Sequence, residues 1–264
     1  MTNLSTKEPI TWCPGCTNFL AKKSYEDALK ELIDENWKKE EFVLVADIGC
    51  SSKMFDYLDV SGFNTLHGRV LPTAFGIKIG NPNLKVIGVA GDGGTYNEGL
   101  DHLIHNCRYN SDMTFIVHNN QLFALTVGQA TAVTELGYKE KTHPFGVKEI
   151  PINPLVLALE SGASFVARVS ALDIQHMKEV LKEAIKHKGF SFVEILQPCI
   201  AFHDIREDLR KNAYKITSMS KEEAIKEAKN WSYNHKGKIP FGIFYKEERA
   251  TFEESYEVLK KKMK

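Results

Sequence analysis

The sequence lacks the features that would make a membrane or a nucleic acid its main partner. No stretch approaches the roughly 18 consecutive apolar residues that a membrane-spanning helix requires. The 34 lysines and arginines are balanced by 34 aspartates and glutamates, and no lysine- and arginine-rich block indicates contacts with nucleic acid. The basic run at residues 260–262 predicts a solvated helix end. The N-terminus is polar and carries no export signal, so we expect a soluble cytoplasmic protein.

Internal repeats and low-complexity segments are also not visible, so nothing indicates a repeat architecture. The 264 residues, 43% of them hydrophobic, can bury one sizeable core. We predict a main domain over residues 1–205 and a C-terminal extension over residues 206–264 that packs on the same domain. The extension is expected to hold a helix near 221–229, a strand near 241–245 and a final helix.

Short β-branched runs alternate with helical patterns along the main domain. Five runs predict buried parallel strands, at residues 42–46, 86–90, 114–117, 165–169 and 192–196. Helical spacing of apolar residues is clearest at 18–36 and 173–186, where Asp173 is expected to be the N-cap. This order favours an α/β fold with a doubly wound, mostly parallel sheet, whose ligands lie at the carboxyl ends of the strands. The long loop at 127–154 is expected to be a lid or a cofactor cover.

A glycine-flanked aspartate follows the second predicted strand. Gly91-Asp92-Gly93 and Gly94 allow the backbone to approach a phosphate group closely, and the carboxylate is a hard ligand suited to magnesium. The next strand ends in Asn119-Asn120, which brings an amide oxygen to the same edge. Each motif alone is a common turn or loop. Together, in this strand-end context, they resemble the thiamine diphosphate signature, so we predict a diphosphate held through magnesium.

The five cysteines favour thiol or metal chemistry over disulfides, because their number is odd and no export signal is present. Cys13 and Cys16 form a CxxC motif at the predicted start of a helix, while Cys50 and Cys199 each follow a strand. Four thiolates that meet at the carboxyl edge suit a [4Fe-4S] cluster. Cys107 lies inside a helical stretch and is expected to be a buried free thiol.

Two other interpretations of the cysteines stay open. A zinc ion with four cysteine ligands uses the same CxxC chemistry, although such sites usually combine two CxxC pairs at compact spacing. A thioredoxin-like redox pair resembles the stretch Trp12-Cys13-Pro14-Gly15-Cys16. Only about a dozen residues precede that stretch, too few for the strand and helix that build such a site.

With these motifs in place, the chain resembles the beta subunit of the 2-oxoacid:ferredoxin oxidoreductase family over roughly residues 10 to 205. Further matching stretches are Ile48-Gly49-Cys50-Ser51-Ser52-Lys53, His67-Gly68-Arg69, Leu71-Pro72-Thr73-Ala74 and Phe123-Ala124-Leu125-Thr126-Val127-Gly128-Gln129. The resemblance implies the thiamine diphosphate-binding fold. It also implies an oxidoreductase that converts a 2-oxoacid, such as pyruvate, to acyl-CoA and carbon dioxide and passes electrons through the cluster to ferredoxin.

The resemblance assigns roles to individual residues. Magnesium would be bound by Asp92, the side chain of Asn120 and the main-chain carbonyl of Leu122. The [4Fe-4S] cluster would be held by Cys13, Cys16, Cys50 and Cys199. Thiamine diphosphate would be lined by Ile48, Gly49, Cys50, Ser51, His67, Gly91, Gly93, Gly94, Ala124 and Leu125. The catalytic candidates are Lys53, which could direct a cation at a substrate carboxylate, and His67.

Three positions depart from the family pattern. The family often has an aspartate where this chain has Gly94, and Gly-Gly-Gln where this chain has Val127-Gly128-Gln129. His118 stands where an acid is common, and a lone histidine at a strand end is more often structural than catalytic.

The resemblance also implies a partner. In the family, the carboxylate that activates thiamine lies on a second α/β domain carried by another subunit. We therefore predict a hetero-oligomer, at least a heterodimer with an alpha subunit, without which this chain is catalytically silent.

Two other functions stay open. One rival is a non-redox thiamine diphosphate-dependent decarboxylase or dehydrogenase subunit with a structural zinc site. Another is a zinc-stabilised nucleotide-binding or regulatory module. The four cysteines favour the redox enzyme over a non-redox thiamine enzyme, which would not need them.

Overall fold

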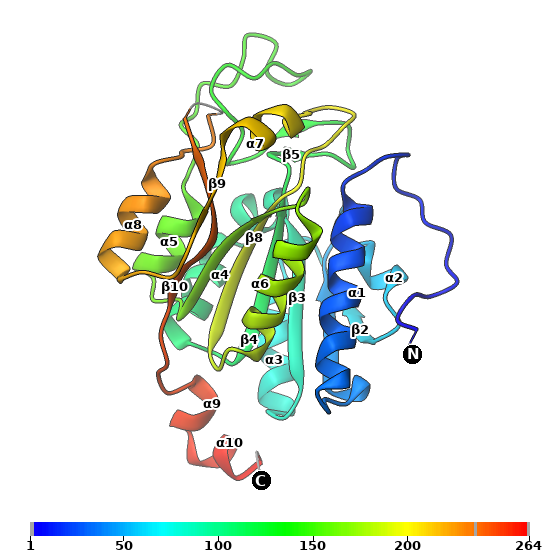
Figure 1. Ribbon diagram of the computed structural model, residues 1–264, viewed down its shortest axis with the longest axis vertical. Helices are drawn as coiled ribbons and strands as arrows, with labels where there is room; N and C mark the ends of the chain where they lie inside the picture. Colours follow the sequence, from blue (N-terminus) through cyan, green and yellow to red (C-terminus); the bar gives the residue numbers. More distant parts are fainter. Residues whose placement is uncertain (1–2, 235–236, 263–264) are drawn as a thin grey trace.

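The computed structural model describes residues 3–234 and 237–262, and its central feature is an eight-stranded sheet (Figure 1). Its strands are β1 (Phe42–Ala46), β2 (Ser61–Asn64), β3 (Lys85–Gly91), β4 (Met113–Asn119), β7 (Phe165–Ser170), β8 (Phe190–Leu196), β9 (Ala213–Ile216) and β10 (Ile239–Lys246). Their spatial order is β2-β1-β3-β4-β8-β7-β10-β9. Neighbouring strands run parallel except for the antiparallel pair of β7 and β10. The predicted mostly parallel α/β sheet is confirmed.

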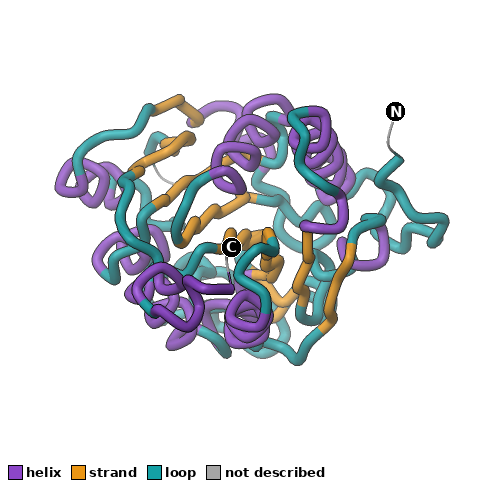
Figure 2. The backbone as a smooth tube through the Cα atoms, turned by 90° about the horizontal axis from the view of Figure 1, so that it is seen from below, coloured by secondary structure: helices purple, strands orange, loops and turns teal. Residues whose placement is uncertain are grey.

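Helices cover both faces of this sheet, as the view from below shows (Figure 2). The α-helices are α1 (Asn18–Asp34), α2 (Met54–Tyr57), α3 (Val70–Gly80), α4 (Leu100–Tyr109), α5 (Pro154–Glu160), α6 (Ile174–Lys186), α7 (Arg206–Asn212), α8 (Lys221–Lys229), α9 (Phe252–Ser255) and α10 (Glu257–Lys262). A 3-10 turn, η1 (Lys39–Glu41), a π-helical turn, η2 (Gly93–Asn97), and a small antiparallel sheet of β5 (Leu122–Phe123) and β6 (Gln129–Ala130) complete the structure.

The core has one layer of buried side chains on each face of the sheet. On one face, α1 and α6 pack side by side and bury Leu29 and Leu181 against the sheet. On the other face, α3, α4, α5 and α8 cover Phe115 and Phe192. Because every residue of β1, β4, β7 and β8 is buried, these strands appear in the sequence as short, largely apolar runs.

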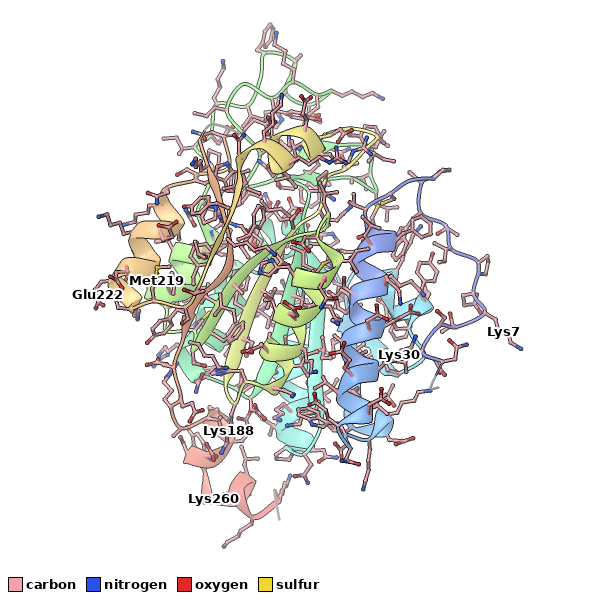
Figure 3. The ribbon with its side chains drawn as sticks, viewed as in Figure 1. Lys7, Lys30, Lys188, Met219, Glu222 and Lys260 are labelled. Atoms are coloured by element: carbon pink, nitrogen blue, oxygen red, sulfur yellow. The ribbon has the colours of Figure 1, made fainter. Side chains whose placement is uncertain are left out.

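The elements expected from the sequence are present, with ends within two residues. The five predicted strands correspond to β1, β3, β4, β7 and β8, and the two clearest helices to α1 and α6. The side chain of Asp173 accepts a hydrogen bond from the His176 N–H at 3.1 Å and so caps α6 as predicted. The helix near 221–229, the strand near 241–245 and the final helix are α8, part of β10, and α9 with α10. The lysines at 260–262 are exposed on α10, and Lys260 projects into solvent (Figure 3).

The carboxyl ends of four adjacent strands, β1, β3, β4 and β8, lie at one edge of the sheet. The chain leaves β1 for the edge strand β2 and returns to β3 on the other side of β1. Such a reversal leaves a crevice at the strand ends, where parallel α/β sheets bind their ligands. The segments that follow these four strands carry Cys50, Asp92, Asn120 and Cys199, and the CxxC motif precedes α1. Within residues 3–234 and 237–262, no helix is both long and apolar enough to cross a bilayer.

Candidate active site

Asp92 lies at the end of β3, where the chain turns into η2. Its side chain is 1% exposed. The Oδ1 atom accepts a hydrogen bond from the Asn120 N–H at 3.4 Å, and Oδ2 accepts one from Thr131 Oγ1 at 2.6 Å. Burial raises the pKa of Asp92 to about 7, although both hydrogen bonds oppose the rise. Burial disfavours the charged form of this carboxyl group, and a nearby cation would stabilise that form.

The other two predicted magnesium ligands lie beside Asp92, in the turn after β4. The Oδ1 atom of Asn120 accepts a hydrogen bond from the Leu122 N–H at 3.0 Å, which fixes the orientation of the amide. Gln121, between them, has a φ of 63°, and Leu122 pairs with Ala130 in the β5–β6 sheet. Asp92, Asn120 and Leu122 therefore line one cavity of about 90 Å³, which we call the cofactor cavity.

Every residue that the resemblance assigned to thiamine diphosphate lines this same cavity. They are Ile48, Gly49, Cys50, Ser51, His67, Gly91, Gly93, Gly94, Ala124 and Leu125. Close packing explains one of the glycines, because a Cβ atom on Gly93 would lie 2.2 Å from the ring of Phe123. Position 93 therefore has no room for a side chain, which is the condition under which a glycine backbone can lie close to a bound group.

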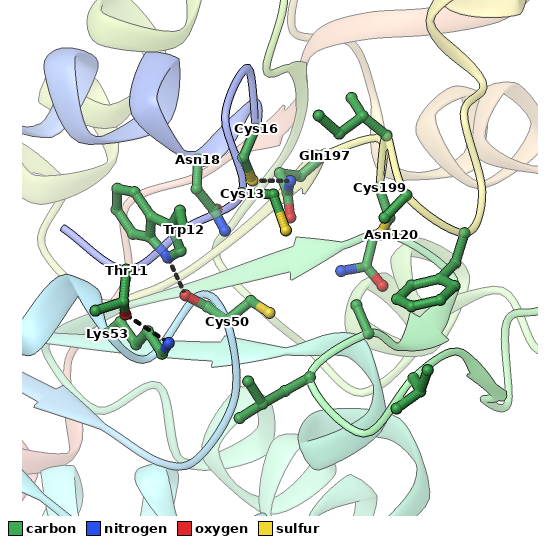
Figure 4. A pocket seen from close by; sticks show the side chains of 16 residues that line it. Thr11, Trp12, Cys13, Cys16, Asn18, Cys50, Lys53, Asn120, Gln197 and Cys199 are labelled. Carbon is green, nitrogen blue, oxygen red and sulfur yellow. Dashed lines mark hydrogen bonds between the residues drawn. The ribbon is translucent and has the colours of Figure 1, made fainter.

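The four predicted cluster ligands line a second, adjoining cavity of about 230 Å³, which we call the thiol cavity (Figure 4). Cys13, Cys16, Cys50 and Cys199 are free cysteines whose side chains surround a common space. Burial raises the pKa of Cys50 to about 11, and the neighbouring thiols add to the rise. Burial raises the pKa of Cys16 as well. The structure therefore brings together four thiols that come from three separate segments of the chain.

The four thiols share a cavity, but they are not arranged around a single point as metal ligands would be. Among the described residues, no group of three or more histidine, cysteine, aspartate or glutamate side chains is arranged to hold a metal ion. The two cavities share Cys50, Asn120, Ala124 and Leu125 as a common wall.

Hydrogen bonds join the three segments that carry the cysteines. Trp12 Nε1 donates to the carbonyl of Cys50 at 2.6 Å, which links the N-terminal segment to the loop after β1. Thr17 Oγ1 donates to the carbonyl of Pro198 at 3.0 Å and accepts from Gln197 Nε2 at 2.7 Å, which links the start of α1 to the loop after β8. These hydrogen bonds hold the three cysteine-bearing segments next to one another around the thiol cavity.

The two turns at this cavity differ in how well their residues suit the backbone. In the CxxC motif, the Cys16 N–H donates to the Cys13 carbonyl at 3.0 Å, and Gly15 has a φ of 79°, which glycine adopts freely. Val127 has a φ of 81°, a conformation that is unusual for a β-branched residue. The family pattern, with glycine at that position, suits this backbone better.

The structure separates the two catalytic candidates. His67 lines the cofactor cavity, with its Nδ1 atom 3.1 Å from a carboxylate oxygen of Glu98. Lys53 instead lines the thiol cavity, where its Nζ atom donates to Thr11 Oγ1 at 2.7 Å. Their catalytic roles stay predictions.

A buried ion pair beneath the site was not foreseen from the sequence. Glu194 of β8 and Arg168 of β7 are both fully buried, and Arg168 Nε donates to Glu194 Oε2 at 2.8 Å. Glu194 Oε1 also accepts from Asn119 Nδ2 at 2.9 Å, from the Tyr96 hydroxyl at 3.1 Å and from the Tyr233 hydroxyl at 3.0 Å. One carboxylate therefore holds both strand-end loops that form the cofactor cavity. Its only signal in the sequence is an acid inside an apolar strand.

His118 is a buried structural residue, as its position at a strand end indicated. Its ring nitrogens lie 3.0 Å from the Tyr25 hydroxyl and 3.0 Å from Asn18 Oδ1. It lines neither the cofactor cavity nor the thiol cavity. Cys107 is buried in α4, as expected.

Acid is expected to destabilise the protein through His118. Burial lowers the pKa of this imidazole to about 3, from 6.5 for an ordinary histidine, so the unfolded state binds a proton that the folded state excludes. The contribution of the neutral His118 to the free energy of unfolding is fully present above pH 6.5. It is lost as the pH falls toward 3, by roughly 1.4 kcal/mol per pH unit. Urea unfolding at several pH values should show a shallower decline for His118→Gln than for the wild type. Parallel declines would contradict this.

Comparisons with known proteins agree with the family and the fold that the sequence predicted. The family model "Thiamine pyrophosphate enzyme, C-terminal TPP binding domain" matches residues 47–195, and the model of the C-terminal part of the pyruvate ferredoxin oxidoreductase beta subunit matches residues 199–261. The chain is 41% identical over 265 residues to the 2-oxoacid:ferredoxin oxidoreductase subunit beta of Saccharolobus solfataricus, with 92% of this chain and 84% of the relative covered. It is 36% identical over 253 residues to the 2-oxoglutarate synthase subunit KorB of Archaeoglobus fulgidus, with 96% and 90% covered.

A solved structure has the same fold. It is a 2-oxoglutarate:ferredoxin oxidoreductase from Magnetococcus marinus with 2-oxoglutarate, coenzyme A and succinyl-CoA bound. The TM-score is 0.90 and the sequence identity 31%, with 96% of this chain and 86% of that chain covered.

Proposed function

The chain belongs to the beta subunits of the 2-oxoacid:ferredoxin oxidoreductases, and on that premise we propose that it combines a magnesium-held thiamine diphosphate with a [4Fe-4S] cluster. The enzyme would carry out the CoA-dependent oxidative decarboxylation of a 2-oxoacid and pass the electrons to a ferredoxin. The observation that carries this proposal is the common wall between the cofactor cavity and the thiol cavity. It would place the electron source beside the electron acceptor.

The residues of the cofactor cavity fit a metal-bound diphosphate. Asp92, Asn120 and the carbonyl of Leu122 would hold the magnesium ion, which takes oxygen ligands. The raised pKa of Asp92 supports this role, because an apposed cation removes the cost of burying its charge. Gly93 and Gly94 line the same cavity, and their N–H groups would donate to phosphate oxygens. When bound, thiamine diphosphate supplies the carbanion that attacks the 2-oxo carbon.

The donor set of the thiol cavity, four cysteines, suits an iron–sulfur cluster. Cys13, Cys16, Cys50 and Cys199 would be the ligands, since thiolates are the usual ligands of [4Fe-4S] clusters. A bound cluster accepts and passes on single electrons. The hydrogen bonds from Trp12 and Thr17 join the segments that carry the cysteines.

A partner subunit would complete the site. Within the described residues, Asp92 is the only acid that lines the cofactor cavity, and it is already assigned to magnesium. The carboxylate that activates the thiamine ring would therefore come from an alpha subunit. Apolar side chains at the rim, Ile48, Leu125 and Val127, are 48%, 46% and 58% exposed, as suits a surface that a partner covers. The working enzyme would be a cytoplasmic hetero-oligomer that binds the 2-oxoacid, coenzyme A and ferredoxin.

Substitution of the thiols tests the cluster. In the alpha–beta complex purified without oxygen, replacing Cys13, Cys16, Cys50 or Cys199 by alanine should remove most iron, sulfide and visible absorbance, because each would supply one of four ligands. Cys107→Ala is the matched control and should retain them, since Cys107 lies in α4 and lines neither cavity. Zinc without iron in the wild type would support the structural zinc site instead. Unchanged iron in all four variants would contradict the assignment.

A further inference from the structure

Asp47 is a fully buried acid directly after β1, and it lines neither the cofactor cavity nor the thiol cavity. Its Oδ1 atom accepts a hydrogen bond from Ser52 Oγ at 2.6 Å, and its Oδ2 atom accepts one from the Gly68 N–H at 3.2 Å. Ser52 follows the loop that lines the cofactor cavity, and Gly68 follows His67, which lines it from the other side. One carboxylate therefore joins two walls of the cavity.

The turn at Gly68 is restricted by further contacts, in addition to its hydrogen bond with Asp47. Gly68 has a φ of 70°, and a Cβ atom on it would lie 2.8 Å from the Cβ atom of Glu98. Arg69 donates to the carbonyl of Glu98 at 2.7 Å. The turn is thus packed against the end of η2 on one side and held by Asp47 on the other, which sets the position of the His67 ring.

The carboxylate of Asp47 also occupies the space beside Gly94. A Cβ atom on Gly94 would lie 2.3 Å from Asp47 Oδ2 and 3.2 Å from the ring of His67. Real side chains do not approach so closely, so Asp47 and any side chain at position 94 exclude each other. A side chain at position 94 would, however, point directly at the place where the Asp47 carboxylate now lies.

We propose that Asp47 is a positioning residue, whose buried carboxylate holds the His67-Gly68 turn against η2. A carboxylate at position 94 could hold the turn equally well. The inference rests on the proposed binding of magnesium and thiamine diphosphate in the cofactor cavity. It accounts for the glycine at position 94, since the carboxylate from β1 already fills that space. Asp47 touches none of the groups that would react, so it should affect the affinity for the cofactor and not the chemical step.

The test is a reciprocal exchange in the alpha–beta complex. Asp47→Ala should weaken thiamine diphosphate binding in the presence of magnesium by about tenfold or more, the usual scale for the loss of a charged hydrogen bond. Gly94→Asp alone should weaken binding as well, because its side chain meets Asp47. The double variant Asp47→Ala/Gly94→Asp should recover to within about threefold of the wild type, which independent substitutions could not do.

Kinetics and a control separate positioning from general damage. The apparent KM for thiamine diphosphate should rise in Asp47→Ala, while kcat at saturating cofactor stays within about threefold of the wild type. Asp101→Ala, which removes an exposed acid of α4, should change neither quantity. A double variant that binds as weakly as Asp47→Ala would overturn the inference, as would a fall in kcat without a change in KM.

The outcome can be told apart from a failure of the proposed function. If the wild-type complex does not bind thiamine diphosphate with magnesium, the proposed function fails. The role of Asp47 in holding the turn is then decided by thermal unfolding. Both single variants should lower Tm, and the double variant should raise it again. A double variant with a Tm below both single variants would overturn the inference as well.

Discussion

Asp92→Ala is expected to abolish magnesium-dependent binding of thiamine diphosphate and to leave the iron content of the complex unchanged. Among the described residues that line the cofactor cavity, Asp92 is the only acid. Removing a residue that merely supports a metal ligand typically costs about 10- to 100-fold in affinity, so the loss of a charged ligand should cost at least about 100-fold. Calorimetric titration with cofactor at fixed magnesium, together with iron analysis, measures both quantities.

Asp92→Asn is the matched control for shape. The amide keeps an acceptor for Thr131 but loses the charge, so cofactor binding should still fail in a folded protein. Burial raises the pKa of Asp92 from 3.8 to about 7, so its contribution to the stability of the cofactor-free protein is present below pH 3.8 and is lost as the pH rises to 7. The asparagine variant should lack this decline. Wild-type affinity in Asp92→Ala, or loss of its iron, would contradict the assignment.

Glu194→Ala is expected to lower the free energy of unfolding by about 3 to 5 kcal/mol, because it leaves the buried Arg168 guanidinium without its counter-charge. It also removes the acceptor of hydrogen bonds from Asn119 and Tyr96. Asn119 ends β4 and Tyr96 lies in η2, both close in sequence to predicted magnesium ligands, so cofactor affinity should fall with stability. Urea unfolding of the purified chain measures the first effect and cofactor titration of the complex the second.

Glu183→Ala provides the comparison for an exposed acid that also pairs with a cation. Glu183 and Lys246 form an ion pair of 3.1 Å whose side chains are 52% and 40% exposed. Surface pairs of this kind contribute about 0 to 1 kcal/mol. If Glu194→Ala costs no more than Glu183→Ala, the buried carboxylate is not the structural anchor that its hydrogen bonds indicate.

The strands and their strand-end motifs could be predicted because burial on both faces leaves a plain trace in the sequence. Runs such as FVLVA in β1 are apolar throughout, and every residue of that strand is buried. The edge strand β2 gave no such signal, since all four of its residues are exposed. Helix α3 was missed for the opposite reason. Its sequence VLPTAFGIKIG contains a proline and two glycines and shows no polar face.

The residues that line the two cavities could be predicted better than the contacts that hold those residues in place. Motifs at the ends of parallel strands meet at one edge whatever the details of packing, so Asp92, Asn120, Cys50 and Cys199 could be grouped from the sequence. Thr131 could not, because its contact with Asp92 depends on the β5–β6 sheet. Lys53 lines the thiol cavity, a position that the sequence did not specify, and its role toward a substrate carboxylate stays a prediction. Side-chain direction is set by tertiary packing, which local sequence does not encode.

The wall shared by the two cavities has a thermodynamic consequence. Cys50 and Asn120 each line both cavities, so whatever binds in one is separated from the other by a single layer of residues. If filling the thiol cavity changes the affinity of the other cavity by some factor, filling the other must change the first by the same factor. Measuring either affinity with the opposite cavity loaded and empty therefore gives the coupling free energy between the two groups.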